Sequence, residues 1–250
     1  MIQLSNIDVT LGKGTQLQCQ LFKNLSFNVP SGEFVMVVGG NGVGKSSLFN
    51  VLTGALKVDS GSLKINQKDA TSWPAHSRAK YVAKVMQDPR VATMDHMTLE
   101  ENLSFAYLRG ESRGLLPFRR PSRLAYFQEK LALLNMGLEH RLQEPTSHLS
   151  GGQRQALSLI MAILRQSDIL LLDEITAALD TKTAQRIMEL TDQIIRQEKR
   201  TTLMITHNLH HALDYGDRTI ILSEGIIAYD FSGNMRRNLT TSNLIEVIEG

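Results

Sequence analysis

The sequence predicts an α/β fold in which a mostly parallel sheet is interrupted by a region of helices. Short, continuously apolar runs, which are typical of buried parallel strands, alternate along the chain with amphipathic helical patterns. One of these runs leads directly into a cluster of glycines and then into a helix. Between residues 88 and 166 the pattern changes and no strand signal occurs. Together these features favour parallel α/β units with a helical insertion.

The first predicted elements surround the glycine cluster. Residues 34–38 are all apolar and predict a buried strand, and the helix after the glycines extends from about 46 to 55. Two later runs, 168–172 and 202–206, predict further strands of the same sheet because each is short and mostly apolar. We therefore expect at least three buried parallel strands.

The remaining core elements follow the predicted strand 168–172. Residues 218–222 and 226–229 predict a final hairpin that turns around Glu224. The tail, 234–250, is polar and then weakly helical. Residues 181–196 predict an amphipathic helix, because one stripe collects its apolar side chains: Ala184, Ile187, Leu190, Ile194 and Ile195.

The helical region has its own internal order. Helical patterns occur near 98–107, 121–134 and 151–165. Between the first two lies the segment 109–123, which carries five arginines and one acidic residue. A solvent-exposed charged face is one interpretation of that segment, and contact with a partner or with anionic lipid is the other.

The composition is that of a folded soluble protein. Of 250 residues, 42% are hydrophobic and 21% are charged, so the chain can bury a core without disulfides. Its single cysteine, Cys19, cannot form an internal disulfide, and we expect a buried or half-buried thiol. The longest apolar runs fall far short of the roughly 20 residues that a membrane-spanning helix needs. Residues 1–30 lack the pattern of a signal peptide, which indicates a cytosolic protein.

The charge balance argues against one class of partner. Lys and Arg number 27 against 25 Asp and Glu, which leaves a formal net charge of +2. Nucleic-acid-binding proteins usually have a much stronger basic bias. We therefore expect no nucleic acid among the partners.

The glycine cluster has the pattern of a phosphate-binding loop. Residues 39–46 match G-x-x-x-x-G-K-[ST] between a predicted strand and a predicted helix. Glycines let successive backbone N–H groups face a phosphate, and the helix N-terminus adds partial positive charge. Lys45 would reach the β and γ phosphates, and the Ser46 hydroxyl would bind Mg²⁺. The alternative is a glycine-rich turn beside a surface lysine.

Two adjacent carboxylates follow a second predicted strand. Residues 169–172 are apolar and end in Asp173 and Glu174, at the end of a parallel strand where ligands bind. Asp173 would hold Mg²⁺ directly or through water, and Glu174 would act as general base toward a water molecule. A solvated strand end is the plain alternative.

A second glycine motif begins a later helix. Ser150 and Gln153 fit a capping box, which a simple helix start would explain. The two glycines between them weaken a helix start, unless the backbone must approach a ligand closely. The motif therefore predicts a second anion-binding site on the same chain.

At these motifs the sequence resembles the ATP-binding-cassette (ABC) ATPases over about residues 1–230. No single motif carries this resemblance, because six family motifs occur in the family's order. They are the Walker A loop (Gly39–Ser46), the Q-loop (Gln87), the signature (Leu149–Gln153), Walker B (Ile169–Glu174), the D-loop (Ala178–Asp180) and the switch histidine (His207).

The resemblance implies a P-loop NTPase (RecA-like) fold. This fold has a parallel-sheet core, an N-terminal antiparallel β subdomain and an inserted α-helical subdomain. We expect one ABC ATPase domain, 1–250, with its core formed by 1–87 and 167–233. The helical signature subdomain would be 88–166, and 234–250 would be a C-terminal tail.

The resemblance also implies a role for each motif. Gln87 would sense Mg²⁺ and the attacking water, and His207 would hold the γ-phosphate together with the base Glu174. In a head-to-tail homodimer, the signature of one subunit would close on ATP held by the other, and Asp180 would cross that interface. The implied catalytic residues are thus Glu174, His207, Gln87 and Lys45.

ATP and Mg²⁺ are the implied cofactors. The expected metal-site residues are Ser46, Gln87 and Asp173. The expected ATP-binding residues are Gly39, Gly40, Asn41, Gly42, Val43, Gly44, Lys45, Ser46 and Ser47, with Ser150, Gly151, Gly152, Gln153 and Asp180.

Three positions depart from the family pattern. Many members have an aromatic side chain that stacks on adenine, but Leu11 stands at the aligned place and cannot stack. Phe22 is an alternative base contact. Ile175 replaces a common proline after the base, and Gly40 replaces a common proline or serine; we expect both to keep activity. Two histidines after the switch histidine, His210 and His211, are expected to be exposed helix residues.

The resemblance implies membrane partners. A single cassette is most often the separate ATPase of a bacterial-type transporter, at the cytoplasmic face of the inner membrane, driving an integral membrane permease. The helices within 88–143 would form the docking groove. The chain further resembles an incompletely characterised importer group with a substrate-binding lipoprotein, some members of which are linked to amino-acid uptake. An exporter or lipoprotein- or lipid-trafficking system is the alternative, and a soluble ABC ATPase that acts on ribosomes or DNA is a third.

Overall fold

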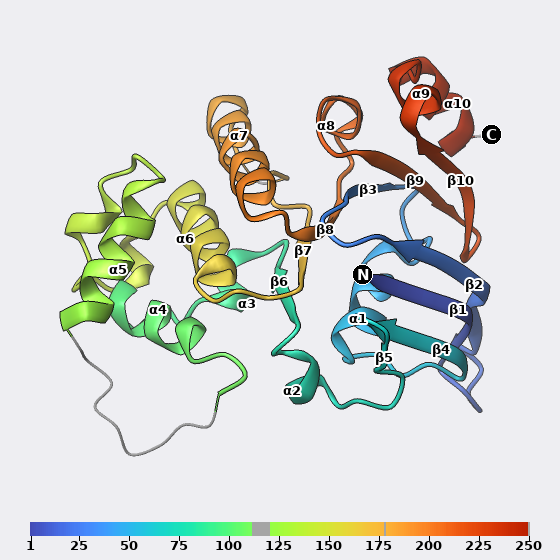
Figure 1. The fold of residues 1–250 in the computed structure, drawn as a ribbon, viewed down its shortest axis with the longest axis horizontal. Coiled ribbons are helices and arrows are strands. Elements are labelled where there is room, and N and C mark those ends of the chain that lie inside the picture. The colour runs from blue at the N-terminus through green and yellow to red at the C-terminus, as the bar shows by residue number, and fades with distance from the viewer. Residues whose placement is uncertain (112–120, 178, 250) are drawn as a thin grey trace.

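The structure is a computed structural model that describes residues 1–111, 121–177 and 179–249. Two sheets and a separate group of helices make up the molecule, as Figure 1 shows. Part of the arginine-rich segment (112–120) and Ala178 of the D-loop lie outside the described residues, together with the apolar stretch 114–118.

The larger sheet has six strands in the order β10-β9-β3-β8-β7-β6. All neighbours are parallel except β9 and β10, which form the predicted antiparallel hairpin. Every residue of β3, β7 and β8 is buried, which explains their largely apolar sequences. The strands are β3 (Phe34–Val38), β6 (Val82–Val85), β7 (Ile169–Asp173), β8 (Thr201–Ile205), β9 (Arg218–Ser223) and β10 (Ile226–Ser232).

The smaller sheet is antiparallel, with strand order β2-β1-β4-β5. Along β1 the buried residues Ile2, Leu4, Ile7 and Val9 face the interior, broadly in the alternation of a sheet that is half exposed. Its strands are β1 (Ile2–Leu11), β2 (Cys19–Val29), β4 (Ser60–Ile65) and β5 (Lys68–Asp69).

Helix α1 (Lys45–Thr53) lies between the two sheets. Its buried side chains Leu48, Phe49, Val51 and Leu52 share one hydrophobic core with both sheets. The helix ends because Gly54, at φ +80°, adopts the left-handed conformation and donates its N–H to the Val51 carbonyl. This end comes two residues before the predicted one.

The helical region forms a separate group at the left of Figure 1. Helix α6 is buried along nearly its whole length, because α3, α4, α5, α7 and β6 all pack against it. Within 88–111 and 121–166 no strand occurs, as predicted. The elements are α3 (Pro89–Ala92), α4 (Leu99–Tyr107), α5 (Pro121–Ala132), η1 (Leu138–His140), η2 (Thr146–His148) and α6 (Gly151–Ile163), with α2 (Ala75–Arg78) before β6.

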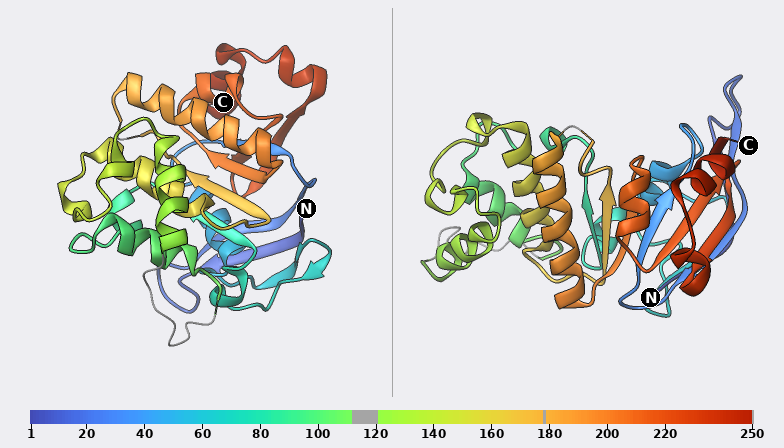
Figure 2. Two further views of the ribbon diagram at one scale, coloured as in Figure 1. Left: turned by 60° about the vertical axis from the view of Figure 1, so that its left-hand side comes forward. Right: turned by 90° about the horizontal axis from the view of Figure 1, so that it is seen from above.

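Helices α7 (Thr181–Glu198) and α8 (Leu209–Asp214) cover the other face of the large sheet, as both views in Figure 2 show. The C-terminal tail folds into α9 (Gly233–Arg237) and α10 (Thr241–Glu249). Leu244 of α10 is fully buried, so this tail is a packed part of the domain.

These observations confirm the predicted α/β fold with an antiparallel subdomain and a helical region. The sequence-based expectation for Cys19 was wrong, because this residue is exposed at the start of β2. Among the helices in the described part of the chain, none combines the length and the apolar character needed to cross a membrane.

Candidate active site

The phosphate-binding loop runs from the end of β3 into α1, as predicted. Gly39 has φ +151°, and a Cβ there would lie 2.2 Å from the Leu222 carbonyl oxygen. Gly44 has φ +102°, and a Cβ there would lie 2.9 Å from the Phe22 ring. Both positions therefore require glycine, because a side chain would strain the backbone and collide with β9 or β2.

Lys45 lies inside this loop. Its ammonium group donates to the carbonyl oxygens of Gly39 at 2.9 Å and Gly40 at 2.7 Å. Burial lowers the pKa of Lys45, while the nearby carboxylates of Glu174 and Asp173 act in the opposite direction. Two carbonyl groups of the loop thus hold the ammonium group of Lys45 within it.

The first residues of α1 face the end of β7. Ser46 Oγ lies 3.4 Å from Asp173 Oδ1, so a hydroxyl and a carboxylate from distant parts of the sequence lie side by side. Both are hard oxygen donors of the kind that Mg²⁺ prefers. The donor set fits a magnesium ion brought by nucleotide phosphates.

The Glu174 carboxylate contacts two other predicted catalytic residues. Its Oε2 accepts a hydrogen bond from Gln87 Nε2 at 3.0 Å, and its Oε1 lies 2.8 Å from His207 Nε2. The three side chains come from the loops after β6, β7 and β8, which are neighbouring parallel strands. Ligand sites of parallel sheets form at this edge.

The backbone of Glu174 has an unusual conformation. Its φ is +49°, which a non-glycine residue adopts at a cost of order 1 kcal/mol. The Glu174 N–H donates to the Ile205 carbonyl at 3.1 Å, which fixes the turn. Ile175, which follows, is fully buried in the core, so the isoleucine replaces proline without leaving the turn unsupported.

The signature residues lie in the helical region. Ser150 and Gln153 form the predicted capping box, with Gln153 N donating to Ser150 Oγ at 3.2 Å and Ser150 N to Gln153 Oε1 at 3.1 Å. A Cβ on Gly151 would meet nothing within 4 Å, whereas one on Gly152 would lie 3.0 Å from Thr183. The open side of Gly151 leaves the helix N-terminus accessible to an anion.

Asp180 begins α7 beside this motif. Its carboxylate accepts a hydrogen bond from Thr183 N at 3.0 Å and caps the helix. Hydrogen bonds from the side chain and the backbone of Thr183 hold the pKa of Asp180 below its usual value.

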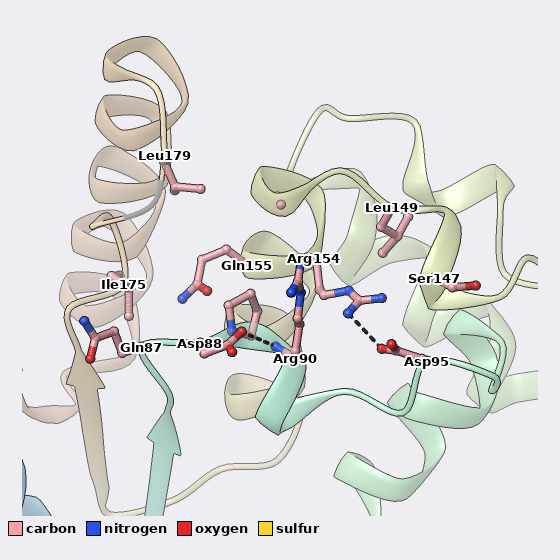
Figure 3. A pocket seen from close by; sticks show the side chains of 12 residues that line it. Gln87, Asp88, Arg90, Asp95, Ser147, Leu149, Arg154, Gln155, Ile175 and Leu179 are labelled. Carbon is pink, nitrogen blue, oxygen red and sulfur yellow. Dashed lines mark hydrogen bonds and ion pairs between the residues drawn. The ribbon is translucent and has the colours of Figure 1, made fainter.

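A groove separates the Q-loop from the signature helix, and Figure 3 shows its lining side chains. It encloses about 480 Å³. Arg154, buried on α6, forms an ion pair with Asp95 at 2.8 Å and donates to the Thr146 carbonyl at 2.9 Å. Gln155 extends toward the Q-loop and donates to the Met86 carbonyl at 3.5 Å. The contact of Gln155 joins the signature helix to the residue directly before Gln87.

Two groups of predicted residues are therefore separate within one subunit. The Walker A loop, Gln87, the Walker B carboxylates and His207 lie at one edge of the large sheet. The signature and Asp180 lie at the neighbouring starts of α6 and α7. Asn41 and Gly42 are exposed at the tip of the loop, and Gly40, Val43 and Ser47 are half-buried.

Phe22, which the sequence offered as an alternative contact for the adenine base, is not accessible to it. Phe22 is fully buried beneath the phosphate loop, so its ring has no free face for a base. Leu11 is 38% exposed at the end of β1, and Leu17 is 85% exposed in the following loop. Two aliphatic side chains are therefore exposed at and after the end of β1.

The histidines after the switch position also differ from expectation. His210 is exposed, as expected, but His211 is half-buried with an unpartnered Nδ1 and packs edge-on against Tyr215. Burial lowers the pKa of His211.

Sequence reasoning missed one residue that touches the site. Lys84 of β6 forms an ion pair with Asp173, with Nζ 3.0 Å from Oδ2. The signal for it was a lysine within the apolar run Val82–Val85, directly before the Q-loop. That strand was not predicted either.

Comparison with known proteins identifies the class. The ABC transporter family model matches residues 22–177. The chain therefore belongs to the ABC transporter family. It is a transport ATPase subunit with ATP and Mg²⁺ as cofactors.

Among its relatives is the tyrosine transport ATP-binding protein of Clostridioides difficile, strain R20291. The two are 40% identical over 249 residues, which cover 100% of this chain and 99% of the relative. The thiamine import ATP-binding protein ThiQ of Yersinia pseudotuberculosis is 33% identical and covers 88% of each chain. The lipid A-core flippase of Salmonella paratyphi A is 32% identical, over 82% of this chain and 34% of the flippase.

Solved structures show the same fold. The dimeric post-hydrolysis state of the ATP-binding cassette MJ0796, bound to ADP and Pi, superposes with a TM-score of 0.81 at 26% identity. The match covers 93% of this chain and 98% of that one. The ADP conformation of the ATP-binding cassette MJ1267 superposes with a TM-score of 0.83 at 24% identity, and the match covers 100% of this chain and 98% of that one.

Proposed function

We propose that this chain is the ATPase subunit of an importer for a small solute such as an amino acid. The observation that carries the proposal is the 40% identity, across nearly the full length of both chains, to a tyrosine transport ATP-binding protein. The import ATP-binding protein for thiamine supports import as the direction.

In this proposal the loop amides and Lys45 bind the β and γ phosphates of ATP. Ser46, Asp173 and Gln87 hold Mg²⁺, whose charge would stabilise the phosphates. The fit is supported by the oxygen donors of Ser46 and Asp173, which lie 3.4 Å apart.

Glu174 is proposed as the general base. Its two carboxylate oxygens lie within hydrogen-bonding distance of Gln87 and His207, so it could orient a water only after one contact is exchanged. His207 would then hold the γ-phosphate. Because Gln87 leads into the helical region, a movement of that region would free or engage the base.

The proposed working unit is a head-to-tail homodimer. In it the Ser150, Gly151 and Gly152 backbone of one subunit would close on ATP bound by the other. The separation of the signature from the phosphate loop within one chain supports this arrangement. Hydrolysis would release the two subunits, and a permease bound to the helical regions would follow the movement.

A second groove is the proposed permease-docking site. It encloses about 810 Å³ and is lined by β6, α2, α4 and α6. Its lining is largely apolar, with Met86, Phe105 and Met161 among the side chains, and Lys80 and Arg109 add positive charge. An amphipathic segment of a permease fits such a lining. We place the complex at the cytoplasmic face of the inner membrane, with a substrate-binding lipoprotein.

The arginines 109–123 are assigned to packing where the structure describes them. Arg109 donates to the carbonyls of Ala162 at 3.2 Å and Arg165 at 3.4 Å. Burial, with Arg200 and Arg165 nearby, lowers the pKa of Arg109 to about 10. Arg123 stacks over the Tyr107 ring at 5.0 Å. These two residues belong to the helical region rather than to a solvated face.

An exporter or lipid-trafficking ATPase is the second candidate, and the match to a lipid A-core flippase favours it. Affinity purification of the tagged chain from native membranes in mild detergent distinguishes the two. A multi-span permease with a substrate-binding lipoprotein, and ATPase activity stimulated by an amino acid, is the expected result. Recovery of a permease with a large outer domain and no binding protein would favour export.

A further inference from the structure

The Mg²⁺ carboxylate Asp173 has a buried cationic partner outside the family motifs. Lys84 Nζ lies 3.0 Å from Asp173 Oδ2, and the side chains are 11% and 7% exposed. Among the ion pairs of the described residues, few have both partners so deeply buried. A buried pair of this kind restricts the carboxylate, because an unpaired charge is costly away from water.

The register of the sheet explains why these residues meet. β6 and β7 are parallel, with Lys84 opposite Leu171, and side chains alternate between the two faces. Lys84 and Asp173 therefore both point to the face that α1 covers. There the ammonium lies 5.7 Å from the centre of the Phe49 ring and 3.5 Å from Asn50 Oδ1. Two residues of α1 thus fix the position of the lysine.

The two oxygens of Asp173 have different neighbours. Oδ1 faces Ser46 Oγ, and Oδ2 faces Lys84. We propose that Lys84 is a positioning residue, which holds Oδ2 from behind so that Oδ1 faces the Mg²⁺ of bound nucleotide. This rests on the proposed role of Asp173 as a metal-site residue. Partners behind a metal-binding carboxylate typically contribute 10–100-fold to metal affinity.

A competing effect has the opposite sign. A lysine near Mg²⁺ also repels the ion, so its loss would tighten metal binding if repulsion dominated. The placement of Nζ on the oxygen away from Ser46 favours orientation as the larger effect. Loss of Lys84 should therefore weaken metal binding if orientation of Asp173 dominates, and strengthen it if repulsion dominates.

The test compares nucleotide affinity with and without metal. A fluorescent ATP analogue is titrated into the purified protein in Mg²⁺ and in EDTA, and the ratio of the two affinities is measured. Lys84→Met should lower this ratio about 10-fold while leaving the affinity in EDTA unchanged. Lys84→Arg should retain most of the ratio, and Lys84→Gln provides a second neutral variant should methionine prevent folding. Lys64→Met is the matched control, since Lys64 is an exposed lysine on strand β4 that has no role in the proposed sites.

An unchanged or increased ratio in folded Lys84→Met or Lys84→Gln would overturn the positioning role. Asp173→Asn separates this failure from that of the proposed function. If Asp173→Asn lowers the ratio and the Lys84 variants do not, only the inference about Lys84 fails. If Asp173→Asn leaves the ratio unchanged, the metal-site role of Asp173 fails, and the inference with it.

Discussion

Glu174 shows how one residue combines strain with hydrogen bonding. It occupies the left-handed region at φ +49°, and its carboxylate contacts Gln87 and His207. Strained conformations of this kind occur at functional sites, where the surrounding structure maintains them. The adjacent strands β7 and β8 supply that support through the bond from Glu174 N to Ile205.

Replacing the Glu174 carboxylate tests its proposed role as the general base. Glu174→Gln should lower the ATP hydrolysis rate by about 10²-fold or more, because an amide cannot accept a proton from water. Its affinity for ATP should remain, since the phosphate loop is unchanged. Glu224→Gln is the control, because Glu224 has a similar φ of +47°, is exposed and is not one of the candidate site residues. Hydrolysis at the wild-type rate in Glu174→Gln would refute the assignment of the base.

Because His211 is partly buried, we expect the stability of the protein to depend on pH. Burial lowers its pKa in the folded protein from the ordinary 6.5, with Asp214 acting in the opposite direction and His210 in the same one. The unfolded chain then binds the proton more readily, so the free energy of unfolding should fall as the pH drops through about 6.5. The loss is complete below the folded pKa.

His211→Phe keeps a ring against Tyr215 and removes the proton-binding group. Urea unfolding midpoints at pH 7.5 and pH 5.5 should differ less in this variant than in the wild type. An equal difference in both proteins would show that another group causes the acid sensitivity.

At the scale of elements, the C-terminal helix α9 forms hydrogen bonds with the end of α8, the helix that follows the switch histidine. Arg236 of α9 donates one guanidinium nitrogen to the carbonyls of Ala212 at 3.2 Å and Leu213 at 3.1 Å, and also to that of Tyr215. These carbonyls end α8, where a cation is favourable. The tail therefore caps α8.

Removing this cap should cost stability. Arg236→Met should lower the free energy of unfolding by about 1–3 kcal/mol, since it removes charged hydrogen bonds to partly buried carbonyls. Arg237→Met, at the exposed neighbouring position, should change it by less than about 0.5 kcal/mol. Chemical denaturation measures both, and equal values for the two variants would contradict the proposed cap.

The elements also show what a sequence pattern can and cannot predict. Strand β3 was predictable because five consecutive apolar residues are buried on both faces, and the α6 start because of its capping box. β6 escaped prediction because a buried lysine interrupts its apolar run. The α8 cap by Arg236 depends on a contact between distant segments, for which local patterns carry no signal.

Some features of the candidate site could likewise be predicted from the sequence, and others could not. Lys45, Asp173 and Glu174 could be placed from motifs, because Asp173 ends β7, Glu174 follows it directly, and Lys45 follows the loop after β3. The burial of Phe22 could not, since it depends on how α1 and β2 pack.

At the scale of the whole molecule, two half-sites lie on different parts of one chain. The phosphate loop belongs to the region between the sheets, and the signature belongs to the helical region, as Figure 1 shows. An isologous contact between two identical subunits can join such halves, because two-fold symmetry pairs the phosphate loop of each subunit with the signature of the other and so produces two equal sites. ATP would act as the ligand that holds the pair together.

Nucleotide should therefore control the oligomeric state. Glu174→Gln with ATP and Mg²⁺ should elute as a dimer in size-exclusion chromatography with light scattering, and as a monomer with ADP. Lys45→Ala introduced into this variant should abolish the dimer, because the phosphates lose their cation. A dimer that is independent of nucleotide would contradict ATP as the link.

The most direct test mixes two inactive variants. Lys45→Ala damages the phosphate loop, and Gly151→Asp adds a negative charge to the signature at a position where a side chain meets no neighbour within 4 Å. Each variant alone should lack ATPase activity. Mixed, they should regain it, because a mixed dimer contains one site with an intact loop from one subunit and an intact signature from the other. Absence of activity in a mixture of two folded variants that form mixed dimers would contradict a site shared between subunits.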